Sequence, residues 1–157
     1  MLDITEELRL LVAKLDDHDI EYALCGGMAM AIYARPRFTI DIDLLIKEES
    51  LAAAMNVAES LAYNIRGKDL SLANGAVEIR RISKVDRDAG DMLTVDFLLV
   101  TPQVREVWDS RLNSDWEGGK LSVVSRAGLI ALKKLSRRPQ DLVDIDSLME
   151  DVRDGES

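Results

Sequence analysis

The feature that most constrains this chain is a pair of acids in an apolar run, Asp41-Ile42-Asp43, which follows a glycine pair, Gly26-Gly27. Side chains alternate along a strand, so Asp41 and Asp43 are expected on one face and Ile42 on the other, toward the core. Two neighbouring carboxylates repel each other unless a cation compensates them. A divalent metal such as Mg²⁺, which takes oxygen ligands, is the simplest explanation. The alternative is a sheet edge where one acid is solvated and the other caps a turn.

A third acid, Asp96, lies in a similar context within the apolar run Thr94–Leu99. If its strand neighbours the one with the acid pair, its Cβ atom would lie about 4.5–5.5 Å from that of its cross-strand partner. Three such carboxylates could hold two metal ions about 3.5–4 Å apart, an arrangement used for in-line phosphoryl displacement. The alternative for Asp96 is an ordinary aspartate at a strand end.

The glycine pair lies between a predicted strand, Glu21–Cys25, and a predicted helix, Met28–Ala34. Without Cβ atoms, the backbone at Gly26 and Gly27 can approach a phosphate closely. The N–H groups that open the following helix would then point at the anion. Taken alone, a glycine pair is weak evidence, because a plain turn between strand and helix is the more frequent explanation.

Length and composition bound the class of protein. A chain of 157 residues with 47% apolar and 31% charged residues is expected to form one soluble domain. Its formal net charge of −9 disfavours general nucleic-acid binding, although a local basic groove stays open. Cys25 is the only cysteine, which excludes an internal disulfide. No signal-like segment or membrane span is predicted, so we expect a cytoplasmic protein.

The remaining patterns predict a mixed α+β fold. Helices are expected at Thr5–Asp16, Met28–Ala34, Leu51–Leu61 after a Ser50 N-cap, Pro102–Arg111, Ser125–Leu135 with Ser125 as its cap, and from Pro139 onward with Leu142, Ile145, Leu148 and Val152 on one face. Strands are expected at Glu21–Cys25, Thr39–Ile46, Ala76–Ile82 after an Asn74-Gly75 turn, Leu93–Val100 and Leu121–Val124, with a charged loop at Lys84–Asp91. We predict a single domain over 1–157, with a core at about 20–124 and closing helices at about 125–152.

Together, Gly26-Gly27, Asp41-Ile42-Asp43 and Asp96 resemble, in order and local context, the nucleotidyltransferases of the polymerase-β-like superfamily. The resemblance implies a small mixed sheet flanked by helices, with two C-terminal helices packed on it. It further implies Mg²⁺-dependent transfer of an NMP, for example from ATP, to an acceptor hydroxyl with release of pyrophosphate. Asp41, Asp43 and Asp96 would be the catalytic and metal-binding residues, with two Mg²⁺ ions, and Gly26 and Gly27 would bind the nucleotide.

The C-terminal part is similar to the closing helices of small nucleotidyltransferases related to abortive-infection toxins and lincosamide-modifying enzymes, through Leu132-Lys133-Lys134 and Arg137-Arg138-Pro139-Gln140-Asp141. This similarity implies that Lys133 contacts the nucleotide phosphates, and Gln140 stands where those families often have a lysine. The alternative for Lys133 is a solvated basic patch near a helix C-terminus. Arg37, just before the acid strand, could also hold phosphate, because a guanidinium matches phosphate geometry; its alternative is an exposed loop.

The acceptor is left open as a small molecule, a protein hydroxyl or a tRNA. A cationic small molecule would suit the acidic chain, and the short chain leaves room for a homodimer or an antitoxin partner to complete the site. The rival function is a non-catalytic interaction protein, such as a toxin–antitoxin component that retains the fold.

Overall fold

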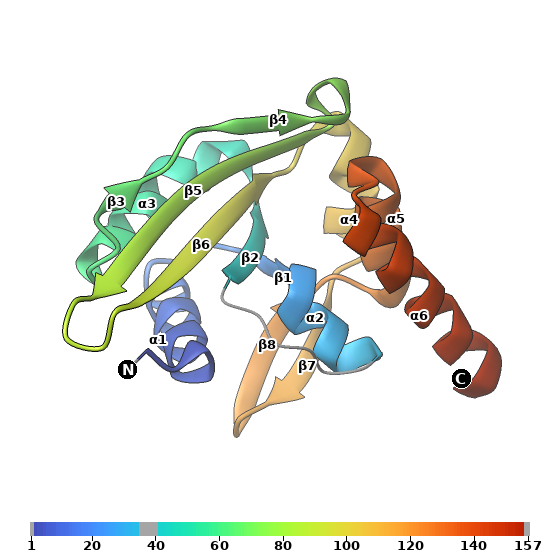
Figure 1. Cartoon of the computed structure of the whole chain (residues 1–157), viewed down its shortest axis with the longest axis horizontal. Helices are drawn as coiled ribbons and strands as arrows, with labels where there is room; N and C mark the ends of the chain where they lie inside the picture. Colours follow the sequence, from blue (N-terminus) through green and yellow to red (C-terminus); the bar gives the residue numbers. More distant parts are fainter. Residues whose placement is uncertain (1, 35–40, 156–157) are drawn as a thin grey trace.

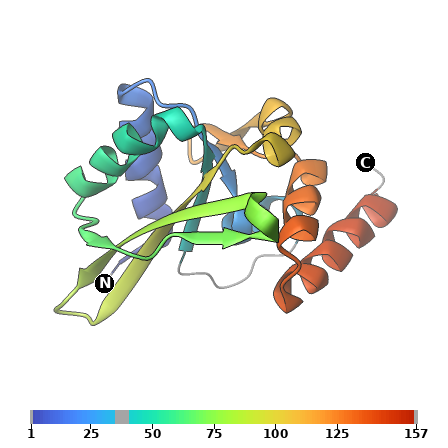
Figure 2. The same cartoon turned by 90° about the horizontal axis from the view of Figure 1, so that it is seen from above.

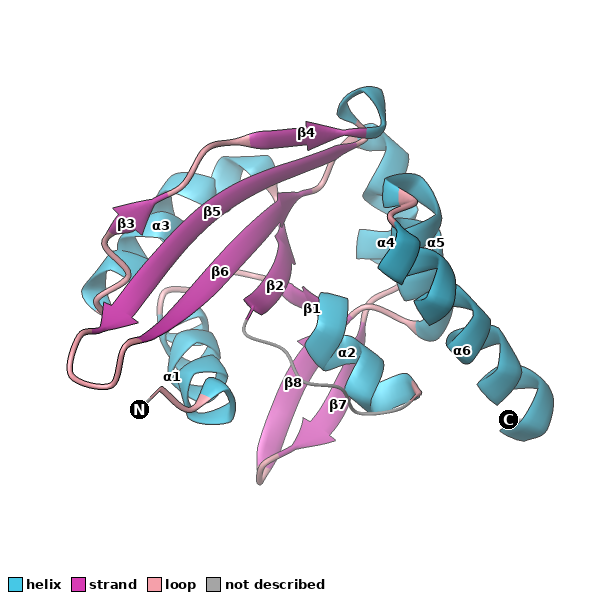
Figure 3. Cartoon of the chain, viewed as in Figure 1, coloured by secondary structure: helices cyan, strands magenta, loops and turns pink. Residues whose placement is uncertain are grey.

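The computed structural model describes residues 2–34 and 41–155. Its helices are α1 Ile4–Asp17, α2 Gly26–Tyr33, α3 Leu51–Ser60, α4 Arg105–Asp109, α5 Arg126–Ser136 and α6 Pro139–Gly155. Its strands are β1 Ala23–Cys25, β2 Asp41–Ile46, β3 Ile65–Arg66, β4 Leu70–Leu72, β5 Val77–Asp86, β6 Asp91–Leu99, β7 Leu112–Trp116 and β8 Gly119–Val123. The predicted mixed α+β class is confirmed (Figures 1 and 3).

The described strands form one mixed sheet in the order β3-β5-β6-β2-β1-β8-β7, and β4 pairs with β5. Two neighbouring pairs are parallel, β2 with β6 and β1 with β8, and the others are antiparallel. The central strand β2 therefore lies between β1, which leads into α2, and β6. This order gives β2 and β6 adjoining places at the centre of the sheet.

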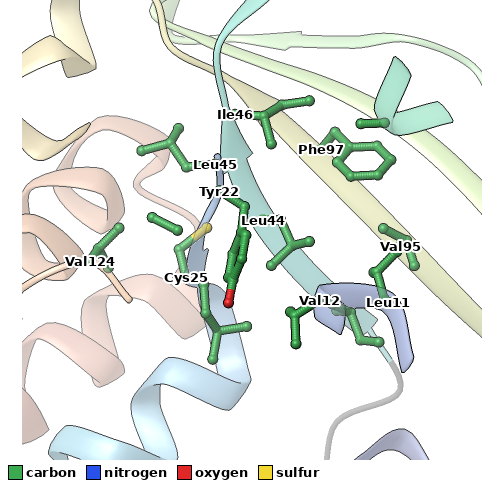
Figure 4. Packing of buried hydrophobic residues seen from close by; sticks show 14 of the residues in the cluster. Leu11, Val12, Tyr22, Cys25, Leu44, Leu45, Ile46, Val95, Phe97 and Val124 are labelled. Atoms are coloured by element: carbon green, nitrogen blue, oxygen red, sulfur yellow. The ribbon is translucent and has the colours of Figure 1, made fainter. Parts of the chain in front are cut away.

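One face of the central strands carries the main hydrophobic core. Ile42 and Leu44 of β2 are fully buried, as are Leu8, Leu11 and Leu15 of α1. Figure 4 shows Leu11 and Val12 close to Val95 and Leu44. Complete burial of a leucine contributes about 1.5–3 kcal/mol, so α1 is held chiefly by this stripe. The acids at alternate positions of β2 are consequently directed to the opposite face.

Helices α5 and α6 pack against each other beside the sheet (Figure 2). Ser125 caps α5 as predicted, because its Oγ accepts a hydrogen bond of 3.0 Å from the Gly128 N–H. Arg137 adopts a left-handed conformation at the end of α5, and α6 begins two residues later at Pro139. The two closing helices are thus joined by a short turn and diverge from it (Figure 2).

Three expectations about local structure are wrong. Ser50 has a helical conformation and makes no side-chain cap, because a short 3₁₀ turn, Glu48–Ser50, precedes α3. The expected charged loop, Lys84–Asp91, is shorter than predicted, because β5 extends to Asp86 and β6 begins at Asp91, which leaves only the turn at 87–90 between them. On α6, the side chains of Asp141, Asp144 and Leu148 are buried, whereas that of Leu142 is exposed. Of the predicted apolar face, Leu148 is therefore buried as expected, whereas Leu142 is not, and two carboxylates occupy inward positions near the start of the helix; the side chain of Val152 lies outside the described residues.

The predicted strand Thr39–Ile46 is described from Asp41 onward, and the short strands β3, β4 and β7 were not predicted. Each of the three has five residues or fewer and lies at the periphery of the sheet, where periodicity gives little signal. Within residues 2–34 and 41–155, no helix combines the length and apolar character needed to cross a membrane.

Candidate active site

The pairing register of β2 and β6 brings the three predicted acids together. Asp43 lies opposite Asp96 in the parallel pair, and Asp41 lies opposite Thr94. Asp41 and Asp43 are two residues apart and share a face, and direct partners across neighbouring strands also share a face. The expected proximity of the two acid-bearing strands is therefore confirmed, and all three carboxylates lie on the face opposite the main core.

The electrostatics reflect this crowding of negative charge. Burial, the Asp96 carboxylate and the Asp41 carboxylate together raise the pKa of Asp43 to about 7. Burial, followed by the charge of Asp96, also raises the pKa of Asp41. Because each carboxylate disfavours ionisation of its neighbours, the cluster gains if a cation binds beside it.

The glycine pair is part of the same arrangement, since α2 begins at Gly26 itself and not after a separate turn. Gly26 has a φ of +69°, a conformation that other residues rarely adopt. A Cβ atom on Gly26 would lie 1.9 Å from Oδ2 of Asp43, so no larger residue fits here without displacing that carboxylate. The first residue of α2 and the Asp43 side chain of β2 are thus in close contact.

Replacing Gly26 by alanine is expected to destabilise the fold by about 1–3 kcal/mol, the cost of a strained backbone conformation, and to move the Asp43 carboxylate. The free energy of unfolding in urea measures the effect. Gly118→Ala is the matched control, because Gly118 also has a positive φ, +80°, but among the described residues none beyond its chain neighbours lies within 4 Å of its added Cβ. Equal losses in the two variants would show that contact with Asp43 adds nothing to the backbone strain.

Asp96 has a partner that the sequence did not predict. Arg81 of β5 lies opposite Asp96 in the antiparallel pair of β5 and β6. Its Nε donates to Oδ1 of Asp96 at 2.8 Å, and its Nη2 donates to Oδ2 at 2.9 Å. Both carboxylate oxygens are therefore engaged by one guanidinium. Only the strand pairing reveals this contact, because Arg81 belongs to a run of charged residues with no distinguishing motif.

The donor chemistry suits a hard divalent cation, since the cluster offers carboxylate oxygens only. The raised pKa of Asp43 also fits such an ion, because a bound cation would favour the ionised carboxylate that its acidic neighbours disfavour. As the described side chains lie, however, no three Asp, Glu, His or Cys residues converge closely enough to hold a metal. Asp96 could take part only after Arg81 releases its oxygens.

Lys133 of α5 is buried, with 5% of its surface exposed. Its Nζ donates to Oδ2 of Asp144 at 2.9 Å and lies 3.7 Å from Oδ1 of Asp141. The alternative interpretation of Lys133 as part of a solvated basic patch is therefore wrong. Gln140 supports the same group, because its Nε2 donates to Oδ1 of Asp144 at 2.9 Å.

Asp141 fastens the junction of the two closing helices. It accepts hydrogen bonds from the Ser136 hydroxyl at 2.6 Å, the Arg138 backbone N–H at 3.0 Å and the Arg138 side chain at 3.0 Å. Burial favours its neutral form, but these hydrogen bonds outweigh burial and lower the pKa of Asp141. The charge of Arg138 opposes the rise in the pKa of Asp41 and of Asp43 but does not reverse it, so this junction also acts electrostatically on the carboxylate cluster.

A cavity of about 390 Å³ unites these groups. Its polar lining comprises Gly26, Gly27, Asp41, Asp43, Arg81, Asp96, Lys133, Ser136, Arg138, Gln140 and Asp141, and its aliphatic lining comprises Leu70, Leu72, Val77, Ile79, Leu98, Leu129 and Leu132. Arg37 lies outside the described residues. An open hollow of about 720 Å³, lined among others by Asp16, Asp19 and Arg111, contains none of the predicted site residues.

Several solved structures share the fold. ANT(2'')-Ia in complex with adenylyl-2''-tobramycin aligns with a TM-score of 0.63 and 14% identity, covering 95% of this chain and 87% of that one. A putative nucleotidyltransferase from Thermotoga maritima aligns with a TM-score of 0.60 and 14% identity, covering 94% and 93%. The lincomycin-bound lincosamide antibiotic adenylyltransferase LnuA aligns with a TM-score of 0.55 and 12% identity, covering 92% and 95%. The TM-scores establish a common fold, and at such low sequence identities they establish nothing about function.

In sequence, no curated protein matches the chain. The family described as "Nucleotidyl transferase AbiEii toxin, Type IV TA system" does match, over residues 9–157. This match includes the glycine pair, the three acids and both closing helices. The chain therefore belongs to the AbiEii family of toxin nucleotidyl transferases of type IV toxin–antitoxin systems.

Proposed function

We propose that the chain transfers an NMP from an NTP to an acceptor hydroxyl, with release of pyrophosphate, in a reaction that depends on Mg²⁺. The observation that carries the proposal is that Asp41, Asp43, Asp96 and the start of α2 all line one cavity. Residues from the sheet and from both closing helices line that cavity, so we also propose that 1–157 acts as one domain.

Each group has a proposed role. Asp41, Asp43 and Asp96 would hold the metal, proposed as two Mg²⁺ ions, which would supply positive charge to neutralise the phosphates. The first backbone N–H groups of α2, at Gly26 and Gly27, bind the triphosphate, because a helix N-terminus attracts anions. Asp96 also accepts the proton of the acceptor hydroxyl as that oxygen attacks the α-phosphorus.

Two basic residues complete the proposed nucleotide site. Lys133 lines the cavity and is retained as a phosphate contact, with Asp144 as its competing partner. Arg37 is retained on the sequence argument alone, through the match between its guanidinium and a phosphate.

The acceptor is a small molecule, a protein hydroxyl or a tRNA. The relatives named with tobramycin and lincomycin make a cationic antibiotic-like molecule a reasonable first choice, and the net charge of −9 favours a cation. The toxin–antitoxin family also suggests an antitoxin partner, and a homodimer is the other assembly that we propose to examine.

A second function has one observation in its favour. Because Arg81 engages both oxygens of Asp96, the chain could serve as a non-catalytic member of a toxin–antitoxin pair. The deciding experiment incubates the protein with Mg²⁺ and each of four α-labelled NTPs, with aminoglycosides, lincosamides, bulk tRNA or cell lysate as acceptors. We expect transferred label and released pyrophosphate with at least one pair. No transfer and no pyrophosphate with any pair would favour the non-catalytic function.

A further inference from the structure

The contact between Arg81 and Asp96 lies where the proposed metal must bind. Parallel pairing sets Asp96 beside Asp43, and antiparallel pairing sets Arg81 on the other side of Asp96. The side chains thus form a row across three strands, in the order carboxylate, carboxylate, guanidinium. Arg81 therefore lies beside the carboxylate cluster and supplies a positive charge to it.

The contact satisfies Asp96 fully but leaves Arg81 partly accessible. The Asp96 side chain is 6% exposed, whereas that of Arg81 is 41% exposed. A bidentate pair of two charge-assisted hydrogen bonds is strong and directional. Hydrogen bonding by Asp96 raises the pKa of Arg81, and the charges of Asp96, Asp41 and Asp43 act in the same direction. The guanidinium therefore responds to the whole cluster while one side remains open to the cavity.

The aliphatic part of the Arg81 side chain, its stem, packs against Gly67. The Gly67 N–H donates to the Arg81 carbonyl oxygen at 3.0 Å. A Cβ atom on Gly67 would lie 3.1–3.2 Å from the first three carbons of the Arg81 side chain, closer than ordinary packing allows. Glycine at 67 therefore leaves room for the aliphatic part of the Arg81 side chain.

We propose that Arg81 is a displaceable counter-ion, which neutralises Asp96 in the metal-free protein and moves to the nucleotide phosphates when metal and nucleotide bind. The inference rests on the proposed function. Metal alone must compete with the guanidinium for both oxygens of Asp96. The metal is expected to bind more tightly when a triphosphate binds with it, because the phosphates offer Arg81 a new bidentate partner. By linkage, each ligand then favours binding of the other.

The first test measures Mn²⁺ binding without nucleotide, by the electron paramagnetic resonance signal of the unbound ion. Arg81→Gln is expected to bind Mn²⁺ about tenfold more tightly than the wild-type protein, since the competing charge-assisted hydrogen bonds are gone. Gly67→Ala, which only disturbs the Arg81 stem, is expected to give a smaller increase. Arg80→Gln is the matched control, because it removes the same charge from the next position, where Arg80 pairs with Asp69 and Glu78.

The second test measures binding of inorganic triphosphate, the portion common to all NTPs, by calorimetry at saturating Mn²⁺. Arg81→Gln is expected to bind it about fivefold more weakly, and Arg80→Gln as tightly as the wild-type protein. The inference is overturned if Arg81→Gln binds Mn²⁺ no more tightly, or binds triphosphate equally well.

The two proposals fail in distinguishable ways. If Asp43→Asn loses Mn²⁺ binding while Arg81→Gln leaves it unchanged, the counter-ion inference fails and the metal site stands. If neither the wild-type protein nor Arg81→Gln binds Mn²⁺, the metal-dependent function fails together with the inference. Should Arg81→Gln not fold, as judged by its melting curve, Gly67→Ala and Arg81→Lys replace it in the test. Both keep a positive charge at position 81 and weaken the two hydrogen bonds to Asp96.

Discussion

Asp43→Asn is expected to reduce nucleotidyl transfer by at least about a hundredfold, the cost of removing one group that stabilises transition-state charge. Asp43 neighbours Asp41 on its own strand and lies directly opposite Asp96 on the next, and both of these carboxylates raise its pKa. Asparagine preserves shape and one oxygen but removes the charge that would hold a cation. The measurement is transfer of α-labelled nucleotide with the acceptor identified in the screen, together with nucleotide affinity by calorimetry.

Stability separates loss of function from loss of fold in this variant. Because its folded pKa is raised to about 7, Asp43 stabilises the metal-free protein only at low pH, and that contribution is lost as the pH rises through 7. In EDTA at pH 8, Asp43→Asn is therefore expected to melt at the same temperature as the wild-type protein or higher. Asp115→Asn is the control, since Asp115 lies on the exposed strand β7 and pairs only with Lys120 among the contacts described. An Asp43→Asn protein with normal transfer would falsify the proposed role of Asp43.

The carboxylate cluster was predictable because its signal is local. Two acids at alternate positions of an apolar run must share a face, and a third acid in a second such run is costly to bury unless a charged partner compensates it. What the sequence did not determine was the pairing of the two strands. That depends on the parallel crossover through α3 and β5, which local periodicity does not describe.

The missed residues share a different cause. Arg81, Asp141 and Asp144 act through partners on other strands or helices, and each of them is hydrophilic in a segment where hydrophilic residues are common. For α6, the apolar spacing of Leu142 and Ile145 suggested the inward face, yet the buried ion pair of Lys133 with Asp144 sets the orientation of the helix. Charge pairing across helices thus outweighed apolar periodicity within one helix.

Lys133→Met is expected to destabilise the protein by about 3–5 kcal/mol, the cost of removing one partner of a buried ion pair. Asp144 is 3% exposed, and this variant would leave its carboxylate without the lysine that compensates it. Methionine fills a similar volume, so packing changes little. The free energy of unfolding in urea measures the loss. Lys134→Met, at the exposed neighbouring position, is expected to change it by less than about 0.5 kcal/mol.

The double variant Lys133→Met with Asp144→Asn is expected to recover most of that stability, because neither charge then remains in the interior. The asparagine introduced in place of Asp144 would keep an oxygen that can accept the hydrogen bond from Gln140. The same protein decides what Lys133 does. If Lys133 only joins α5 to α6, recovered stability should bring recovered transfer activity. If Lys133 also contacts the phosphates, the double variant should be stable and bind triphosphate weakly, because Lys133 lines the cavity and Asp144, the other residue changed, is not among its lining residues.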